Sequence, residues 1–144
     1  MKKVLITGGS GFIGFHLAKK CVKLNLEVTS ISRNNPPKRR RLKKVQYIKC
    51  DLTKKSEVKN KLKKQYDYIF NLSGTVNHNN KKKTFLSHYQ AVQNLTKRYL
   101  NSPPKMFVQL SSSAEYGGIS KPPEEKLNCK PKSFYGRAKF KSTK

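Results

Sequence analysis

Two residues near the end of the chain have the types and spacing needed for proton transfer. Tyr135 and Lys139 are four positions apart in a segment expected to be helical, Tyr135 to Lys144, so both side chains lie on one face. A free tyrosine has a pKa of about 10 and is a poor base at neutral pH. A nearby ammonium favours the phenolate and lowers that pKa. The pair predicts a tyrosine that exchanges a proton with a substrate oxygen, although alone it is also an ordinary surface pair.

A glycine cluster near the N-terminus supplies a site for a second reactant. The apolar run 4–7 is typical of a buried parallel strand, and a helical pattern follows the glycines. Both Gly9-x-Gly11-x-x-Gly14 and the wider spacing Gly8-x-x-Gly11-x-x-Gly14 fit a dinucleotide-binding turn, in which glycines allow a tight turn and close approach of a pyrophosphate. The free N–H groups of the following helix would bind the phosphates. The sequence context favours nucleotide binding over a simple glycine turn.

The end of the second expected strand indicates which cofactor binds. In this type of sheet the ligand lies beyond the carboxyl ends of the strands, where an acid would contact the ribose and an Arg would accept a 2′-phosphate. The chain has Ser32-Arg33 there and no acid, with Lys38 to Arg41 following as an exposed basic loop. We therefore expect NADP, with NAD as the alternative if Arg33 is only one more basic residue. With oxidised nicotinamide bound, Tyr135 can move the proton while hydride passes to or from the cofactor.

Two further strand ends carry candidate site residues. Asp51-Leu52 follows the third expected strand, where Asp51 either contacts the adenine or only caps a helix. Ser112 follows the fifth expected strand and can hydrogen-bond the same substrate oxygen as Tyr135, with Ser113 as the second choice.

The elements that must position these residues alternate between strand and helix, which predicts βαβ units and a parallel sheet covered on both faces. Thr53 is the expected cap of the second helix. Residues 77–83 are expected to form a polar loop, and the lysine runs 54–55 and 81–83 to be solvated faces and loops. The expected strands are 4–7, 27–33, 45–49, 66–72 and 106–110, and the main helices are 11–24, 84–100 and 135–144.

Taken together, these motifs make the chain resemble the short-chain dehydrogenase/reductase superfamily, and specifically its extended type, the NAD-dependent epimerase/dehydratase family of nucleotide-sugar enzymes. The segment 7–14, Thr-Gly-Gly-Ser-Gly-Phe-Ile-Gly, is similar to the opening motif of that family. Residues 70–74 resemble its fourth-strand cofactor wall, and residues 111–117, Ser-Ser-Ser-Ala-Glu-Tyr-Gly, resemble the segment with its catalytic Ser or Thr. The resemblance implies an α/β fold with a Rossmann-type doubly wound parallel sheet.

The resemblance also implies a set of site residues. The catalytic residues would be Ser112, Tyr135 and Lys139. The residues that would bind the cofactor are Gly8, Ser10, Gly11, Phe12, Ile13, Gly14, Arg33, Asp51, Leu52, Leu72, Ser73, Gly74, Tyr135 and Lys139.

Two features depart from the family pattern. The acidic ribose contact is absent, and the chain ends within the helix that carries Tyr135 and Lys139. Residues 1–144 would thus be one NAD(P)-binding Rossmann domain, truncated before the last strands and the substrate domain. Such a fragment should expose an edge and apolar surface. A homodimer or a partner chain would cover that edge.

Three functions follow from the residues and the resemblance. The first is an NAD(P)-dependent nucleotide-sugar epimerase, dehydratase or reductase that moves hydride at a sugar carbon. Glu115 resembles the acid of the dehydratases, but Ala114 stands where a second acid is expected. The second is a non-catalytic cofactor-binding fragment or subunit that needs a partner chain. The third is non-specific nucleic-acid binding through charge.

Composition limits the third function. The net charge of +26 suggests an anionic partner. However, most basic residues are lysines spread over expected helices and loops, without interleaved aromatic stacking platforms. We therefore interpret the charge as solvated surface, with no specific nucleic-acid site.

The cysteines and histidines indicate neither disulfides nor a metal. Cys21, Cys50 and Cys129 are widely spaced, which is typical of reduced thiols in the cytoplasm. Cys21 is expected on an apolar helix face. His16, His78 and His88 do not cluster with acids or cysteines, so no metal site is expected. No apolar run approaches the roughly 18 residues of a membrane span, and the N-terminal strand leaves no room for a signal peptide.

Overall fold

The computed structural model describes residues 1–118 and 128–144. Within them, five parallel strands form one sheet in the order β3-β2-β1-β4-β5. The strands are β1 (Lys3–Thr7), β2 (Glu27–Ser32), β3 (Val45–Lys49), β4 (Tyr68–Asn71) and β5 (Met106–Gln109). The strand order reverses at β1, with β2 on one side and β4 on the other, so the carboxyl ends of β1 and β4 mark the switch point where ligands bind in such sheets.

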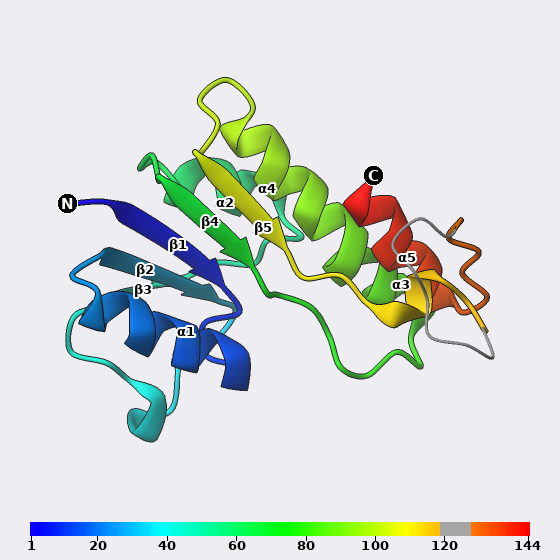
Figure 1. Cartoon of the computed structure of the whole chain (residues 1–144), viewed down its shortest axis with the longest axis horizontal. Helices are drawn as coiled ribbons and strands as arrows, with labels where there is room; N and C mark the ends of the chain where they lie inside the picture. The colour runs from blue at the N-terminus through cyan, green and yellow to red at the C-terminus, as the bar shows by residue number, and fades with distance from the viewer. Residues whose placement is uncertain (119–127) are drawn as a thin grey trace.

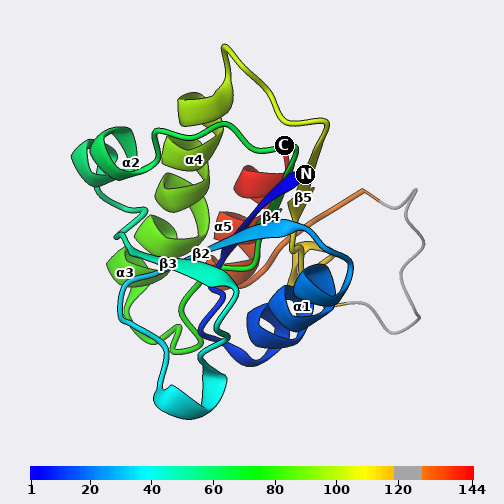
Figure 2. The ribbon, with the colours of Figure 1, turned by 90° about the vertical axis from the view of Figure 1, so that its left-hand side faces the viewer.

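Helices cover both faces of the sheet, as expected for a doubly wound fold. Helix α1 (Phe12–Lys23) packs on one face, where Ala18 and Cys21 meet Val4, Ile6 and Val28. Helices α2 (Lys55–Lys61) and α4 (Ala91–Tyr99) cover the other face, as Figures 1 and 2 show from two directions. The α/β Rossmann-type prediction is confirmed, and Cys21 is the small core residue that the sequence indicated.

The helix expected at 84–100 begins earlier than the sequence suggested. Helix α3 (Lys81–Phe85) continues through a π-helical turn, η2 (Leu86–Gln90), into α4, with helical backbone angles at the junctions. The prediction that residues 81–83 belong to a loop was therefore wrong. The side chain of Asn80 accepts a hydrogen bond from the Lys83 N–H at 2.8 Å and caps the helix there, so the lysines occupy its exposed first turn.

Two local predictions also need correction. Helix α2 has Lys54 at its N-cap, without a side-chain hydrogen bond, so Thr53 does not cap it. Part of the basic loop after β2 forms one 3₁₀ turn, η1 (Lys38–Arg40), instead of an open loop. Another 3₁₀ turn, η3 (Ser113–Glu115), follows β5, and the last element is helix α5 (Phe134–Thr143).

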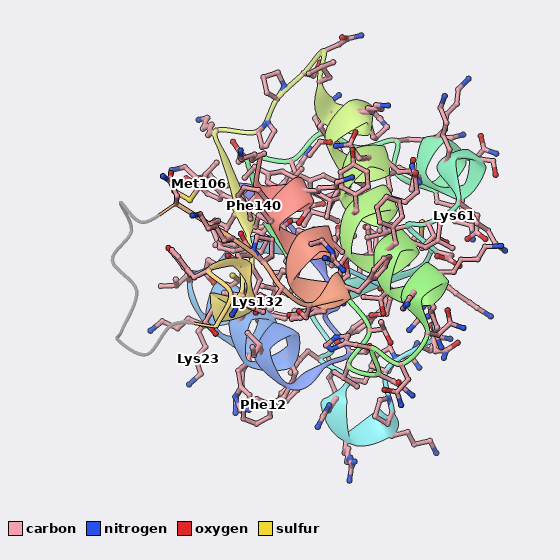
Figure 3. All side chains as sticks on the ribbon, turned by 90° about the vertical axis from the view of Figure 1, so that its right-hand side faces the viewer. Phe12, Lys23, Lys61, Met106, Lys132 and Phe140 are labelled. Carbon is pink, nitrogen blue, oxygen red and sulfur yellow. The ribbon has the colours of Figure 1, made fainter. Side chains whose placement is uncertain are left out.

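The sheet has β3 and β5 at its edges. On the β5 side, Met106 is 51% exposed and Leu110 is 42% exposed, so apolar side chains accompany a strand edge that no other described strand pairs with. Figure 3 shows Met106 and Phe140 on the β5 and α5 side of the molecule. In the part of the chain that the structure describes, no helix combines the length and the apolar character needed to cross a membrane.

Candidate cofactor and active site

A cleft of about 440 Å³ opens at the carboxyl ends of the strands. It is formed by the glycine loop, the segments that follow β2, β3 and β4, and one side of η2 and α4. Twelve of the fourteen residues expected to bind the cofactor line it: Gly8, Ser10, Gly11, Phe12, Ile13, Gly14, Arg33, Asp51, Leu52, Leu72, Ser73 and Gly74. The fold therefore brings together residues that are up to 66 positions apart. Tyr135 and Lys139 lie outside this lining.

The glycine loop is held in a conformation that side chains would disturb. Gly8 has φ of +69°, and a Cβ there would come within 2.9 Å of the Leu72 carbonyl oxygen. A Cβ on Gly14 would come within 2.5 Å of the Gly8 oxygen, so α1 packs directly on the turn. The N–H of Gly11 donates to the Gly8 oxygen at 2.9 Å and closes the turn. Gly8, Gly11 and Gly14, the wider of the two spacings, thus have the backbone roles that the motif requires.

The N-terminus of α1 faces this loop and is suited to an anion. Its N-cap, Gly11, has no side chain, and the first turn contains no acidic residue. The first backbone N–H groups of a helix lack partners within it, and the helix dipole adds positive potential there. Residues 11–14 also line the cleft. A pyrophosphate would fit this position both by charge and by hydrogen bonding. Phe12 is 68% exposed and points outward (Figure 3).

Basic residues after β2 border the same end of the cleft. Arg33 lines it and is exposed, and within the described residues no hydrogen bond or ion pair engages its guanidinium. Arg40 of η1 reaches back and donates from Nη1 to the Ser10 carbonyl oxygen at 3.2 Å. The Ser10 N–H in turn donates to Ser32 Oγ at 3.2 Å. The basic turn is thereby attached to the glycine loop, which the sequence did not indicate.

The side chain of Asp51 closes a local turn. Its Oδ1 accepts from the Thr53 N–H at 3.0 Å and from Thr53 Oγ1 at 2.8 Å. Because α2 begins after Lys54, Asp51 does not occupy the N-cap of that helix. The other interpretation, contact with the adenine, stays a prediction, supported by the position of Asp51 and Leu52 in the cleft lining.

A polar network joins the carboxyl ends of β1, β4 and β5. Thr7 Oγ1 donates to Asn71 Oδ1, and Asn71 Nδ2 donates to Gln109 Oε1 at 2.7 Å. Ser73 donates from Oγ to the same Asn71 oxygen at 2.9 Å and from its N–H to Thr7 Oγ1 at 3.2 Å. The network fixes the wall of the cleft at Ser73. Thr7, Asn71 and Gln109, which form this network with Ser73, were not among the fourteen residues expected to bind the cofactor.

Ser112 caps the η3 turn after β5. Its Oγ accepts from the Ala114 N–H at 3.2 Å, and among the described residues no acceptor engages its hydroxyl proton, which can therefore be donated to a ligand. Glu115 is 4% exposed, and its carboxylate accepts from Ser111 Oγ at 2.7 Å and from Thr143 Oγ1 at 2.8 Å. Glu115 therefore ties η3 to α5 and does not line the cleft.

Helix α5 rests directly on η3 and thereby places Tyr135 and Lys139. A Cβ on Gly136 would come within 2.3 Å of the Ala114 carbonyl oxygen, so only glycine permits this contact. Lys139 is 4% exposed, and its Nζ donates to the carbonyl oxygen of Leu110, which lines the cleft. Burial lowers the pKa of the Lys139 ammonium from its ordinary value, and the charge of Glu115 partly opposes this. Lys139 thus lies beside one end of the cleft.

Two histidines that were not expected at the site meet Tyr135. The His78 ring stacks on the Tyr135 ring, with centroids 3.9 Å apart, and His88 contacts Tyr135 edge-on at 4.9 Å. Neither histidine stands near Tyr135 in the sequence, and no spacing signal links them to it. Across the described ranges 1–118 and 128–144, no three His, Cys, Asp or Glu side chains are grouped to hold a metal ion.

Comparisons with known proteins agree with this architecture. Residues 4–144 match the model of the NAD dependent epimerase/dehydratase family. A solved UDP-galactose 4-epimerase is 25% identical, with a TM-score of 0.86, over 97% of this chain and 48% of its own. The UDP-Glc/GlcNAc 4-epimerase of Campylobacter jejuni is 23% identical, with a TM-score of 0.89, over 99% of this chain and 47% of its own.

A third similar structure is a UDP-glucuronic acid 4-epimerase from Bacillus cereus in complex with NAD. It is 24% identical, with a TM-score of 0.81, over 98% of this chain and 50% of its own. The chain thus spans about half the length of these solved structures. Since the family model matches nearly all of the sequence, the chain belongs to the NAD dependent epimerase/dehydratase family.

Proposed function

We propose that this chain binds a nicotinamide dinucleotide and takes part in hydride transfer at a sugar carbon of a nucleotide sugar. The observation that carries the proposal is the contact between the two halves of the site. Lys139 Nζ donates to the Leu110 carbonyl, and Leu110 lines the cleft that begins at the glycine loop. Tyr135 lies one turn earlier on the same helix. The epimerases of similar fold, one of them solved with NAD, support the choice of reaction.

The residues of the chain suit the proposed chemistry. A nicotinamide held in this cleft would supply the acceptor and donor of hydride for a sugar carbon. Tyr135 takes the proton of the sugar hydroxyl as the hydride leaves and gives it back afterwards. Lys139 lies one helical turn after Tyr135, so both side chains lie on the same face of α5. The Ser112 hydroxyl donates a hydrogen bond to the reacting oxygen of the sugar and thereby orients it. Isomerase, lyase and oxidoreductase outcomes share these steps.

The test compares Tyr135→Phe with the unchanged chain. Purified protein is mixed with cofactor and UDP-glucose as the probe, and reduced nicotinamide is followed by absorbance. We expect Tyr135→Phe to bind cofactor normally and to lose hydride transfer by about a hundredfold or more. Arg137→Ala, an exposed position on the same helix, is the control. Unchanged hydride transfer in Tyr135→Phe would contradict the proposed role of Tyr135.

The cofactor is proposed to be NADP, with NAD as the alternative. Arg33 lines the cleft with its guanidinium uncommitted among the described residues, and Arg40 adds charge beside Ser10. A guanidinium can bind a 2′-phosphate through paired, charge-assisted hydrogen bonds. Arg33→Ala should weaken NADPH binding about tenfold and leave NADH binding unchanged. Arg39→Ala, in the same basic turn but outside the cleft lining, should change neither. A preference of the unchanged chain for NADH would support NAD.

A second candidate is a cofactor-binding module that acts only beside another chain. The observation in its favour is that Met106 and Leu110 are exposed on the β5 side of the sheet. The exposed apolar residues beside β5 give such a partner, or a second copy of the chain, a surface to cover. Two results together would favour this candidate. The chain alone would bind the cofactor without transferring hydride, and transfer would begin when a partner chain is added.

Nucleic-acid binding is the least supported function. Figure 3 shows Lys23, Lys61 and Lys132 projecting from different parts of the surface. Charge distributed in this way favours non-specific, salt-sensitive association over the reading of base edges.

A further inference from the structure

Two histidine side chains from two different segments meet the ring of Tyr135. The imidazole of His78, in the segment after β4, lies nearly parallel to the phenol ring, at 14° and with a centroid distance of 3.9 Å. The imidazole of His88, from the π-helical turn η2, meets the same ring edge-on, at 76° and 4.9 Å. The phenol ring is therefore in contact with one histidine on its face and another at a steep angle.

One carbonyl group orients both imidazoles. His78 Nε2 and His88 Nε2 lie 2.8 Å and 3.0 Å from the carbonyl oxygen of Thr75. With a proton on Nε2, each ring donates to that oxygen. Thr75 is itself buried, so the shared acceptor is a fixed point between the two rings. The plane of the His78 ring is thus set by a hydrogen bond as well as by its stack on Tyr135.

The histidine pair is also attached to the wall of the cofactor cleft. Gly74 lines the cleft, and a Cβ there would come within 2.3 Å of His88 Cε1. His88 is 5% exposed and packs against the Gly74 backbone. The positions of Tyr135 and of the cleft wall are therefore connected through His88, His78 and the backbone of 74–75.

We propose that His78 is a positioning residue for Tyr135, holding the phenol ring in the plane from which its oxygen exchanges a proton with the substrate. The proposal rests on the acid/base role of Tyr135 given above. A phenol ring turns about two side-chain torsions, and a stacked partner restricts both. Proton transfer needs its donor and acceptor in hydrogen-bond reach, so a ring that samples other planes loses rate. The imidazole contributes a flat face and a fixed orientation.

Fluorine NMR tests the contact without any turnover. The full chain is prepared with 3-fluorotyrosine at position 135, alone and with His78→Ala, His78→Phe or His16→Ala. We expect His78→Ala to move the signal toward that of free fluorotyrosine, because the ring current of the imidazole is removed. His78→Phe keeps a flat ring and should leave the signal displaced. His16, an exposed histidine on α1, is the matched control and should change nothing. An unchanged signal in His78→Ala would overturn the proposal.

A rate measurement then tests positioning, as opposed to contact alone. Hydride transfer from UDP-glucose as the probe should fall about three- to tenfold in His78→Ala, with cofactor affinity unchanged, and recover in His78→Phe. Because His78 is exposed, its replacement is not expected to unfold the chain. An unchanged rate in His78→Ala would overturn positioning, whereas an unchanged rate in Tyr135→Phe would overturn the role of Tyr135 itself. The fluorine signal distinguishes the two failures, since it reports the stack in either case.

Discussion

Gly136 of α5 lies against the backbone of Ala114 in η3, at a distance that leaves no room for a side chain. A Cβ at position 136 would approach the Ala114 carbonyl oxygen to 2.3 Å. This contact joins the helix that carries Tyr135 and Lys139 to the turn capped by Ser112, so one glycine sets the relative position of all three proposed catalytic residues.

Gly136→Ala should therefore push α5 away from η3. We expect a loss of about 1–3 kcal/mol in the free energy of unfolding, because a backbone carbonyl cannot move aside as a side chain can. Chemical denaturation measures this loss. Gly118→Ala is the matched control, because its new Cβ would meet only the flexible end of Lys132, at 3.3 Å. Equal stability of the two variants would contradict the assigned packing.

The glycine loop gives a second prediction. Gly14→Ala would place a Cβ within 2.5 Å of the Gly8 oxygen and 2.6 Å of Gly9 Cα, so α1 must shift from the turn. We expect cofactor affinity to fall by at least tenfold, along with a loss of about 1–3 kcal/mol in stability. Gly11→Ala meets only the Gly8 oxygen, at 3.2 Å, and should destabilise the fold less. Calorimetric titration and denaturation of both variants measure these effects. A larger stability loss in Gly11→Ala would contradict the assignment.

His88 should make stability depend on pH. Burial, together with the charge of Lys139, lowers the pKa of His88 to about 4. In the unfolded chain its pKa is about 6.5, so between these values the unfolded state binds a proton that the folded state does not. The stability is fully present above pH 6.5 and declines as the pH falls toward 4, by up to about 3 kcal/mol. Denaturation across this range measures the decline.

The control for that decline is His88→Gln, which removes the titrating group and keeps an N–H donor that can reach the Thr75 carbonyl. This variant should lose stability less steeply between pH 6.5 and 4. His16→Gln, on an exposed helix face, should keep the slope of the unchanged chain. If His88→Gln keeps that slope as well, the buried neutral state assigned to His88 is wrong.

Charge and the β5 edge should together make the isolated chain only marginally stable. The net charge is +26, with seven acidic residues to offset it, and apolar side chains accompany the β5 edge. We expect thermal unfolding below about 60 °C in the monomer, and an increase in Tm between low and physiological ionic strength as repulsion is screened. A cooperative monomeric transition above that temperature, insensitive to salt, would contradict this expectation.

The sequence contains most of the information for the sheet and little for the contacts around Tyr135. The apolar run before the glycines and the alternation of strand and helix predict β1, α1 and the parallel order, because burial on both faces requires continuous apolar strands. Twelve expected cofactor residues meet in one cleft, because the carboxyl ends of parallel strands lie at one edge. Their contacts with a bound cofactor stay a prediction.

The parts that were missed depend on tertiary contacts. The start of α3 at Lys81 was mistaken for a loop because lysines and asparagines carry no apolar period, although Asn80 caps the helix. His78 and His88 are ten positions apart and meet only because the π-helical turn and the Thr75 carbonyl direct both rings to Tyr135. The role of Gly136 follows from its approach to Ala114, more than twenty positions earlier, and no local pattern indicates that approach.

The central claim is that the cleft of this chain binds a nicotinamide dinucleotide. The most direct measurement is titration of the purified chain with NADPH and with NADH, following cofactor fluorescence at two salt concentrations. We predict micromolar binding that tolerates salt and favours NADPH, because the glycine loop and the α1 N-terminus hold the pyrophosphate and Arg33 adds the 2′-phosphate contact. Binding of neither cofactor, or binding that disappears at modest salt, would contradict the claim.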